Sequence, residues 1–233
     1  MNFLPVLDIR GGIVVRALAG RRAEYQPLTS RLTDSTDPLA VATAIRDRFG
    51  WADVYVADLD SITACRFAPD LALIERFRAA GFRLWLDAGV RTAADADHIA
   101  VAGLERVVVG LETLGDLAAW REIVSRLGAE LAVFSLDLRD GRPLASAPLD
   151  AVAAVERIVT DGGRQLIVLD LARVGLGSGP GTESLCAELV RRHPGLTVYA
   201  GGGVRGREDV RRLEAAGVTG VLLASALHDG AFV

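Results

Sequence analysis

The sequence predicts an α/β fold in which the whole chain, residues 1–233, forms one closed (β/α)₈ barrel made of two fused half-barrels. Short apolar runs alternate with amphipathic segments from one end of the chain to the other, and the second half of the sequence repeats the first. A chain of 233 residues also lies within the length range of barrels of this kind. Together these observations favour one large core over two separate domains.

Eight apolar runs rich in Val, Leu and Ile are the expected strands. They are continuously apolar instead of alternating with polar residues, which is typical of parallel strands that helices cover. The expected strands are 3–9, 54–59, 82–88, 106–110, 131–138, 165–171, 196–202 and 220–225.

The segments between these runs have the pattern of amphipathic helices. Several begin with an Asp, Ser or Thr cap, and a glycine follows closely behind several others. The expected helices are 37–49, 68–80, 92–102, 114–127, 149–159, 182–192 and 206–216. The segment after Ser225 is too short for a full eighth helix. Regular alternation predicts a parallel sheet, and eight units predict its closure into a TIM barrel.

An internal repeat supports two half-barrels, of about residues 1–115 and 116–233. Residues 84–114 align without gaps with residues 198–228, and shorter segments around the other strand ends align in the same way. The aligned pairs are Gly89 and Gly203, Arg91 and Arg205, Asp8 and Asp137, and Asp58 and Asp170. The repeat therefore predicts a pseudo-twofold axis through the barrel.

Composition excludes several classes of function. The net charge is −4 and the arginines are spread along the chain, so we expect no nucleic-acid partner. No stretch is apolar for the 18 or more residues that a membrane span needs, and the N-terminus does not resemble a signal peptide, so we expect no membrane partner and a cytoplasmic location. The chain has 26 basic residues and none of them is Lys, which excludes Schiff-base and pyridoxal phosphate chemistry. We expect no cofactor.

The cysteines and histidines give no sign of a metal site. Cys65 and Cys186 are far apart in sequence and have no partner at metal-ligand spacing, so we expect both to be buried as small apolar residues. His98 and His193 fall within or at the end of expected helices. His228 follows the last strand, where we expect a surface position, with a site role as the alternative.

Four of the expected strands end in an aspartate: Asp8, Asp58, Asp137 and Asp170. A carboxylate at this end of a barrel strand points into the mouth, where neighbouring carboxylates can be tuned into an acid and a base. The repeat places Asp8 and Asp137 across the mouth from each other, which favours a catalytic role for that pair. The alternative is structural: the carboxylates cap the next helix or pair with Arg10, Arg139 or Arg173.

Glycines after the seventh and eighth strands predict a phosphate site. Gly202 and Gly203, together with Ala224 and Ser225, occupy the place where this fold most often binds phosphate through backbone N–H groups. The first-half equivalents, Gly89 and Gly110, are further candidates for phosphate binding, although the added carboxylate of Asp87 would repel a phosphate there. Arginines of the first loop, Arg16, Arg21 and Arg22, suit bidentate contacts to an anionic substrate.

These features together resemble the barrels of histidine biosynthesis. That family contains phosphoribosylformimino-aminoimidazole carboxamide ribotide isomerase and the cyclase subunit of imidazole-glycerol-phosphate synthase. The isomerase is the more similar, through VLDIRGGIVVR (6–16), DP (37–38), VADL (56–59), VVVG (107–110), SLDLR (135–139), GGGVR (201–205) and GVLLASALHDGAF (220–232). The resemblance implies that Asp8 is the base of an Amadori rearrangement and that Asp137 matches the fifth-strand aspartate.

The chain departs from the isomerase pattern at two places. After the sixth strand, Val174 replaces an aspartate implicated as the general acid, and Leu169 replaces a threonine that contacts substrate. A valine cannot donate a proton. In the first loop, RRAEYQPL (21–28), with ADLDSI (57–62), resembles a divergent group of barrels in methanogens and methylotrophs. Those organisms make methanopterin- and methanofuran-type carriers, which links the chain to C1 metabolism by association.

The leading hypothesis is an isomerase, or a related lyase, that acts on a small phosphorylated sugar-like substrate as a monomer or homodimer. Proton transfer at carbon would use Asp8 as base and Asp137 or Asp170 as acid. Two alternatives stay open. One is a genuine histidine-pathway isomerase, and the other is a non-catalytic barrel that binds a phosphorylated metabolite.

Overall fold

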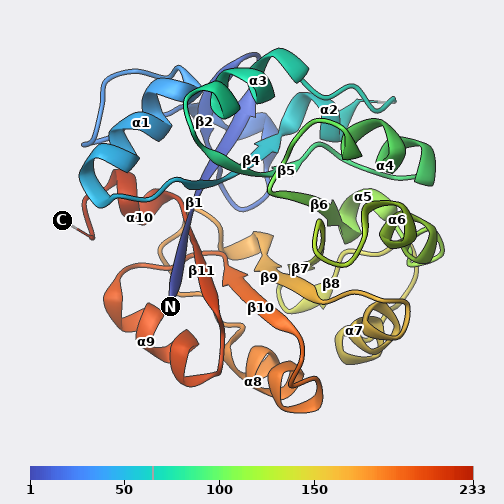
Figure 1. Cartoon of the computed structure of the whole chain (residues 1–233). Coiled ribbons are helices and arrows are strands. Elements are labelled where there is room, and N and C mark those ends of the chain that lie inside the picture. Colours follow the sequence, from blue (N-terminus) through green and yellow to red (C-terminus); the bar gives the residue numbers. More distant parts are fainter. Residues whose placement is uncertain (65, 233) are drawn as a thin grey trace.

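A computed structural model describes residues 1–64 and 66–232 and has the expected closed barrel of parallel strands. The strands are β1 (Asn2–Arg10), β4 (Asp53–Asp58), β5 (Arg83–Asp87), β6 (Arg106–Gly110), β7 (Ala132–Arg139), β9 (Gln165–Asp170), β10 (Thr197–Gly201) and β11 (Gly220–Leu223). Figure 1 shows blue β1 beside red β11, where pairing from Asn2 with Gly220 to Pro5 with Leu223 closes the ring. The predicted fold class is confirmed.

Helices cover the outside of this ring (Figure 1). They are α1 (Pro38–Phe49), α3 (Leu71–Ala79), α4 (Ala93–Ala100), α6 (Trp120–Leu127), α7 (Ala151–Thr160), α8 (Glu183–Arg192) and α9 (Arg207–Ala215). Side-chain caps begin several of them: Asp37 accepts from the Ala40 backbone nitrogen, Asp150 from that of Ala153, and Thr92 forms a capping box with Asp95. The expected helix 114–127 was wrong at its start, because Gly115, with a φ of 72°, ends a separate short helix there.

Short helices that the sequence did not predict follow directly on several strands and surround the barrel mouth. They are α2 (Leu59–Thr63), α5 (Leu111–Leu114), α10 (Ser225–His228) and the 3₁₀ turns η1 (Arg22–Glu24) and η2 (Leu171–Arg173). Because α2, α5, α10 and η2 each start one or two residues after a strand of the barrel ends, the chain turns at once across the mouth. The residues at these junctions are thereby fixed at the C-terminal edge of the sheet.

Two strands extend beyond the barrel as hairpins, which the sequence analysis missed. β1 turns into the antiparallel β2 (Ile13–Arg16), which pairs with β3 (Gln26–Pro27), and β7 turns into β8 (Arg142–Pro143). Each turn has two residues with positive φ, as a type I′ turn requires: 59° and 77° at Gly11 and Gly12, and 52° and 75° at Asp140 and Gly141. The Gly-Gly and Asp-Gly pairs were the available signal. Both hairpins follow the strands that carry Asp8 and Asp137.

The core has two parts. Apolar side chains between the strands and the outer helices form the larger one. A second cluster fills the barrel itself, where Tyr55, Trp85 and Tyr199 meet, with the Trp85 and Tyr199 ring centroids 4.8 Å apart. Large side chains therefore fill the barrel below its mouth, and the C-terminal end of the strands is the end where sites of this fold are built.

The remaining expectations on cysteine, histidine and surface are mixed. Cys186 is buried, as predicted, whereas Cys65 lies outside the described residues. The surface position expected for His228 was wrong: the side chain is 3% exposed, its Nδ1 lies 2.9 Å from Ser30 Oγ, and burial lowers its pKa to about 4.

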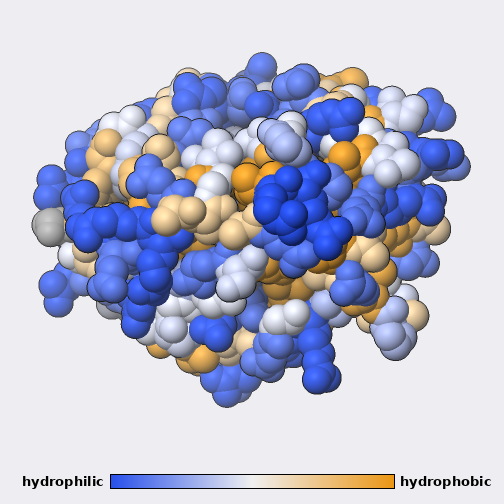
Figure 2. All heavy atoms as spheres, turned by 90° about the horizontal axis from the view of Figure 1, so that it is seen from below, coloured by the Kyte–Doolittle hydropathy of each residue, from blue (hydrophilic) through white to orange (hydrophobic). Residues whose placement is uncertain are grey.

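Hydrophilic side chains cover most of the face shown in Figure 2, with apolar ones interspersed. Within the described ranges, no helix combines the length and apolar character that crossing a bilayer demands.

Candidate active site

A cavity of about 350 Å³ opens at the C-terminal end of the strands and draws its walls from both halves of the chain. The first half contributes most of the carboxylates, and the second half contributes Asp137 and most of the glycines. The polar or glycine residues that line it include Asp8, Arg22, Tyr55, Asp87, Glu112, Asp137, Gly202, Gly203 and Ser225. The structure therefore brings together the two aspartates that the repeat singled out and the second-half phosphate segment.

Asp8 lies on β1 and forms no ion pair in the described part of the chain. Arg10, its expected structural partner, instead donates to the backbone oxygens of Arg22 at 2.6 Å and Tyr25 at 2.7 Å, and so holds the first loop. Burial raises the pKa of Asp8 to about 7, the positive charge of Arg22 lowers it, and the neighbouring Asp87 raises it. Asp8 can consequently exist in both protonation states at neutral pH.

Asp137 on β7 is held more tightly. It is 7% exposed and accepts hydrogen bonds from Ser135 Oγ at 2.7 Å and from the Glu112 backbone nitrogen at 3.0 Å. Both bonds favour the ionised form, yet burial outweighs them and, with the nearby Asp87 and Glu112, raises the pKa of Asp137 to about 7. The alternative expectation of a pair with Arg139 is not found among the described contacts.

A third carboxylate, Asp87 at the end of β5, belongs to the same group, whereas the sequence indicated it only as a charge that would repel phosphate. It accepts from the Gly89 backbone nitrogen at 3.0 Å and from the Tyr55 hydroxyl at 3.4 Å. Burial raises the pKa of Asp87 to about 6 despite these bonds. The Asp87 and Asp137 carboxylates converge on Gly110, where an added Cβ would lie 3.6 Å from one and 2.9 Å from the other.

Three desolvated carboxyls in one cavity form a coupled acid and base system. A carboxyl with a pKa near 7 can accept a proton in one step and return one in the next, which general acid–base catalysis at neutral pH requires. Because the groups interact, their protons leave in steps that belong to the group as a whole. Within the described residues, no three His, Cys, Asp or Glu side chains are placed to hold a metal ion.

The predicted phosphate segment forms the opposite wall. Gly202 and Gly203 have φ values of 92° and 76°, and an added Cβ would lie 2.6 Å from the Asp170 oxygen and 2.8 Å from the Arg173 oxygen, respectively. Only glycine fits there. With Ala224 and Ser225, these residues give the cavity a wall of bare backbone that an anion can approach closely.

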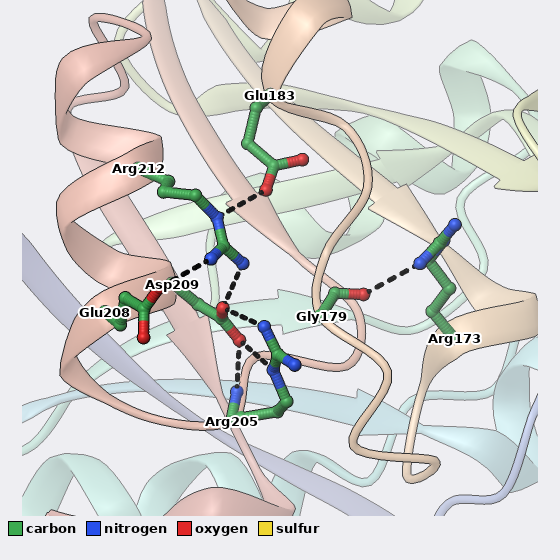
Figure 3. Close-up of polar contacts among 7 residues, drawn as sticks. All are labelled: Arg173, Gly179, Glu183, Arg205, Glu208, Asp209 and Arg212. Atoms are coloured by element: carbon green, nitrogen blue, oxygen red, sulfur yellow. Dashed lines mark hydrogen bonds and ion pairs between the residues drawn. The ribbon is translucent and has the colours of Figure 1, made fainter.

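A polar network follows this glycine wall in the chain, and Figure 3 shows its residues. The buried Asp209 accepts from the Arg205 backbone nitrogen at 2.8 Å and from its Nε at 2.9 Å, and these bonds lower the pKa of Asp209. Arg212 joins Asp209 to Glu183 of α8, with 3.2 Å from Nε to Glu183 Oε1. The loop before α8 is tied in through Gly179, whose backbone nitrogen donates to Gly203 at 2.9 Å.

Asp58 and Asp170, which the sequence could not assign, lie outside the cavity lining. Asp170 is 2% exposed and accepts from the backbone nitrogens of Asp140, Gly141 and Ala172 at 2.9–3.2 Å. Asp58 likewise accepts from Ser61 and Asp70. Both carboxylates hold backbone turns, so the geometry favours the structural interpretation for Asp58 and Asp170.

The first-loop arginines take different positions. Arg22 lines the cavity and pairs with Glu112 at 2.7 Å. Arg16 forms a two-bond pair with Asp229, at 2.6 and 2.8 Å, and Arg21 pairs with Glu24 at 3.3 Å. Arg22 is thus the arginine of this loop that the structure brings to the carboxylates.

Tyr55, Glu112 and Ser135 are site residues that the sequence analysis did not name. Ser135 precedes Asp137 by two positions on one strand, so both side chains point into the barrel, and that spacing was a usable signal. Glu112 and Tyr55 gave no comparable signal, because their approach to the carboxylates depends on barrel closure.

Comparisons with known proteins agree with this architecture. The profile of a family described as "Histidine biosynthesis protein" matches residues 2–233. An uncharacterized protein of Methanocaldococcus jannaschii is 32% identical over 99% of this chain and 94% of its own length. Isomerases named for an imidazole-4-carboxamide that carries two 5-phosphoribosyl groups are also similar. The Xanthomonas oryzae protein is 34% identical over 97% of this chain and 93% of its own length. The Desulforudis audaxviator protein is 29% identical over 99% of this chain and 87% of its own length.

Proposed function

This chain belongs to the histidine biosynthesis protein family, and from that premise we propose that it is an isomerase acting on a small phosphorylated sugar-like substrate. The substrate's phosphate lies against Gly202, Gly203 and Ser225, and its reacting carbons lie between Asp8 and Asp137. One observation carries the proposal: two carboxyls with pKa values raised to about 7 share a cavity with the glycine wall.

The proposed reaction moves a proton between neighbouring carbons of an opened aminoaldose. Asp8, ionised, removes the proton from C2, and the electron pair of that bond forms a C1–C2 double bond as the C1 iminium becomes an enamine. Asp137, ionised after the ring has opened, takes the enol proton from the C2 oxygen, and Asp8 gives its proton to C1, so that an aminoketose results and both carboxyls return to their starting states. Asp137, protonated, serves as the acid that opens the sugar ring by giving its proton to the ring oxygen.

This assignment accounts for the missing acid after the sixth strand. Val174 lines the cavity and packs against the apolar cluster inside the barrel. Because its side chain is a hydrocarbon, it has no proton to donate. Asp137, whose raised pKa keeps a share of it protonated at neutral pH, is the carboxyl best suited to replace it. Ser135 and the Glu112 backbone nitrogen hold it in place.

A second candidate is the reaction for which the Xanthomonas and Desulforudis relatives are named, since the identities of 34% and 29% extend over nearly the whole chain. Leu169 and Val174 weigh against it, because loss of a positioned general acid typically costs on the order of 10²- to 10⁴-fold in rate. We expect that the gene, at ordinary expression, does not restore growth of a bacterium lacking that isomerase. Restored growth would establish the second candidate.

A deuterium exchange assay tests the proposal without a known substrate. The protein is incubated in D₂O with a mixture of phosphorylated metabolites, and mass spectrometry follows the uptake of carbon-bound deuterium. Because carboxylates exchange their protons with solvent, we expect a phosphorylated compound to gain deuterium. Asp8→Asn should slow that gain on the order of 10²-fold, and the control Asp97→Asn, on an exposed helix surface, should not change it. Equal uptake with Asp8→Asn would refute the mechanism.

Three narrower expectations stay predictions. The Methanocaldococcus relative supports membership of the divergent group found in methanogens and methylotrophs. A role in making methanopterin- or methanofuran-type carriers would appear as loss of such a carrier when the gene is deleted. The cytoplasmic location and the monomeric or homodimeric state can be measured by fractionation and by sedimentation.

A further inference from the structure

The two halves of the mouth differ in one respect that bears on substrate choice. We propose that Asp87 is a built-in anion that fills the first-half counterpart of the phosphate site, so that the enzyme selects substrates with a single phosphate group. This inference rests on the proposed function, because it takes the second-half glycine wall as the place where that phosphate binds.

The internal repeat gives the comparison. With the gap-free offset of 114 residues, Asp87 corresponds to Gly201 and Gly89 to Gly203. In the first half, the Gly89 backbone nitrogen donates to Asp87 Oδ1 at 3.0 Å. In the second half, the Gly203 backbone nitrogen has no protein acceptor among the described residues. In the first half the Asp87 carboxylate therefore occupies the Gly89 amide, whereas in the second half the Gly203 amide is left for a ligand.

A second amide of the first half is taken in the same way. The Glu112 backbone nitrogen, which corresponds to that of Ala226, donates to Asp137 Oδ2 at 3.0 Å. Leu111 stands at the position of Ser225, and its fully buried side chain packs in the outer core, so no hydroxyl is offered. An anion arriving here would find the donors already used.

The first-half loop is also closed over its own glycine. Arg91 donates to the backbone oxygen of Gly89 at 2.8 Å and to that of Ile62 at 2.7 Å, which pulls the loop onto α2. A Cβ on Gly89 would lie 2.9 Å from Ile62 Cα. Consequently neither Gly89 nor Gly110, both predicted as phosphate ligands from the sequence, belongs to the cavity lining.

Charge adds to the exclusion. Asp8, Asp87, Glu112 and Asp137 all line this end of the cavity, and the arginine among them, Arg22, is already paired with Glu112 at 2.7 Å. A phosphate dianion would meet carboxylates without a free cation, which costs energy in a desolvated site. Carboxylates accept hydrogen bonds, so this end suits hydroxyl or amine groups of the substrate.

Phosphate stoichiometry tests the inference. The natural protein and its variants are titrated with inorganic phosphate at pH 8 in a calorimeter, and crystals grown in phosphate locate the bound ions. We expect one phosphate per chain, at Gly202, Gly203 and Ser225. Asp87→Gly, which frees the Gly89 amide, should bind a second phosphate beside Gly89. Asp87→Asn keeps the size of the side chain and removes its charge, and serves if Asp87→Gly does not fold. Asp97→Asn, an exposed neutralisation elsewhere, should still bind one.

The possible failures separate the two proposals. Two phosphates bound to the natural protein would overturn the inference and leave the proposed function standing. One phosphate in the natural protein and in both folded Asp87 variants would show that Asp87 does not set the number, and would also overturn the inference. No phosphate at all at the glycine wall would contradict the phosphate part of the proposed function itself.

Discussion

The carboxylates of Asp87 on β5 and Asp137 on β7 face the same backbone position on β6, the strand between them. A Cβ at Gly110 would lie 3.6 Å from Asp87 Oδ2 and 2.9 Å from Asp137 Oδ2. Gly110 has an ordinary φ of −81°, so space alone, and not backbone conformation, demands glycine here. The gap at Gly110 lets two carboxylates from different strands occupy the same end of the cavity.

Substitution of Gly110 by alanine should therefore destabilise the protein. Asp137 cannot move away without losing its bonds to Ser135 and Glu112, so overpacking should cost about 1–3 kcal/mol in the free energy of unfolding. Urea denaturation measures it. The control is Gly195→Ala, where an added Cβ meets nothing within 4 Å, and where we expect a change within about 0.5 kcal/mol. An equally small change for Gly110→Ala would mean that the carboxylate is not held.

Stability should fall as the pH rises toward neutrality. The pKa of Asp137 is about 7 in the folded protein and 3.8 for an ordinary aspartate, so between these values the folded state binds more protons than the unfolded state. Stability contributed by that proton is present below pH 4 and lost by about pH 7. Asp137→Asn removes the loss, and the Ser135 hydroxyl can turn to accept from its amide. At pH 8 the variant should be more stable than the natural protein, on the order of 1–4 kcal/mol, with little difference at pH 4. Thermal unfolding at both pH values measures the difference. A variant that is less stable than the natural protein at pH 8 would contradict this prediction.

Asp170→Asn should impair folding stability more than chemistry. The carboxylate accepts three backbone N–H groups with its two oxygens, and an amide nitrogen in place of one oxygen leaves a donor facing a donor. We expect a loss of about 1–3 kcal/mol in unfolding free energy, with turnover within about tenfold of the natural protein below its melting temperature. A loss of turnover as large as that of Asp8→Asn would return Asp170 to the catalytic group.

Arg22→Met should raise the pKa of Asp8 further. The guanidinium lowers the pKa of Asp8 in the natural protein, and methionine keeps much of the side chain's length without the charge. The variant should therefore need a higher pH to ionise its base, and the acidic limb of the pH–activity profile should move upward. Arg21→Met, an exposed neighbour paired with Glu24, is the matched control and should leave the profile in place.

Local patterns in the sequence predicted the barrel because strand and helix periodicity, caps and the repeat all depend on nearby residues. The same patterns placed Asp8, Asp137, Gly202 and Gly203 at the mouth. They favoured Asp137 through the repeat but left the choice of acid open between Asp137 and Asp170, since both end apolar strands. The difference lies in the neighbours: backbone nitrogens of the β7–β8 turn reach Asp170, whereas Asp137 faces the cavity.

Long-range pairing explains the other misses. Arg16 was expected to bind an anion, but Asp229, 213 residues away in sequence, occupies it with two hydrogen bonds. Asp87 was recognised as a charge that repels phosphate, while its bond to Gly89 became visible only in three dimensions. His228 was placed on the surface because nothing in the sequence shows that the segment around Ser30 covers it.

The most direct test of the acid and base pair is a carbon-13 NMR titration of the aspartate carboxyl carbons, with Asp8 and Asp137 assigned through their Asn variants. Both carboxyls should titrate with midpoints near pH 7, far above the ordinary value of 3.8, because burial desolvates them. Midpoints for Asp8 and Asp137 close to 4 would mean that both are ionised throughout the neutral range, and that neither can act as an acid.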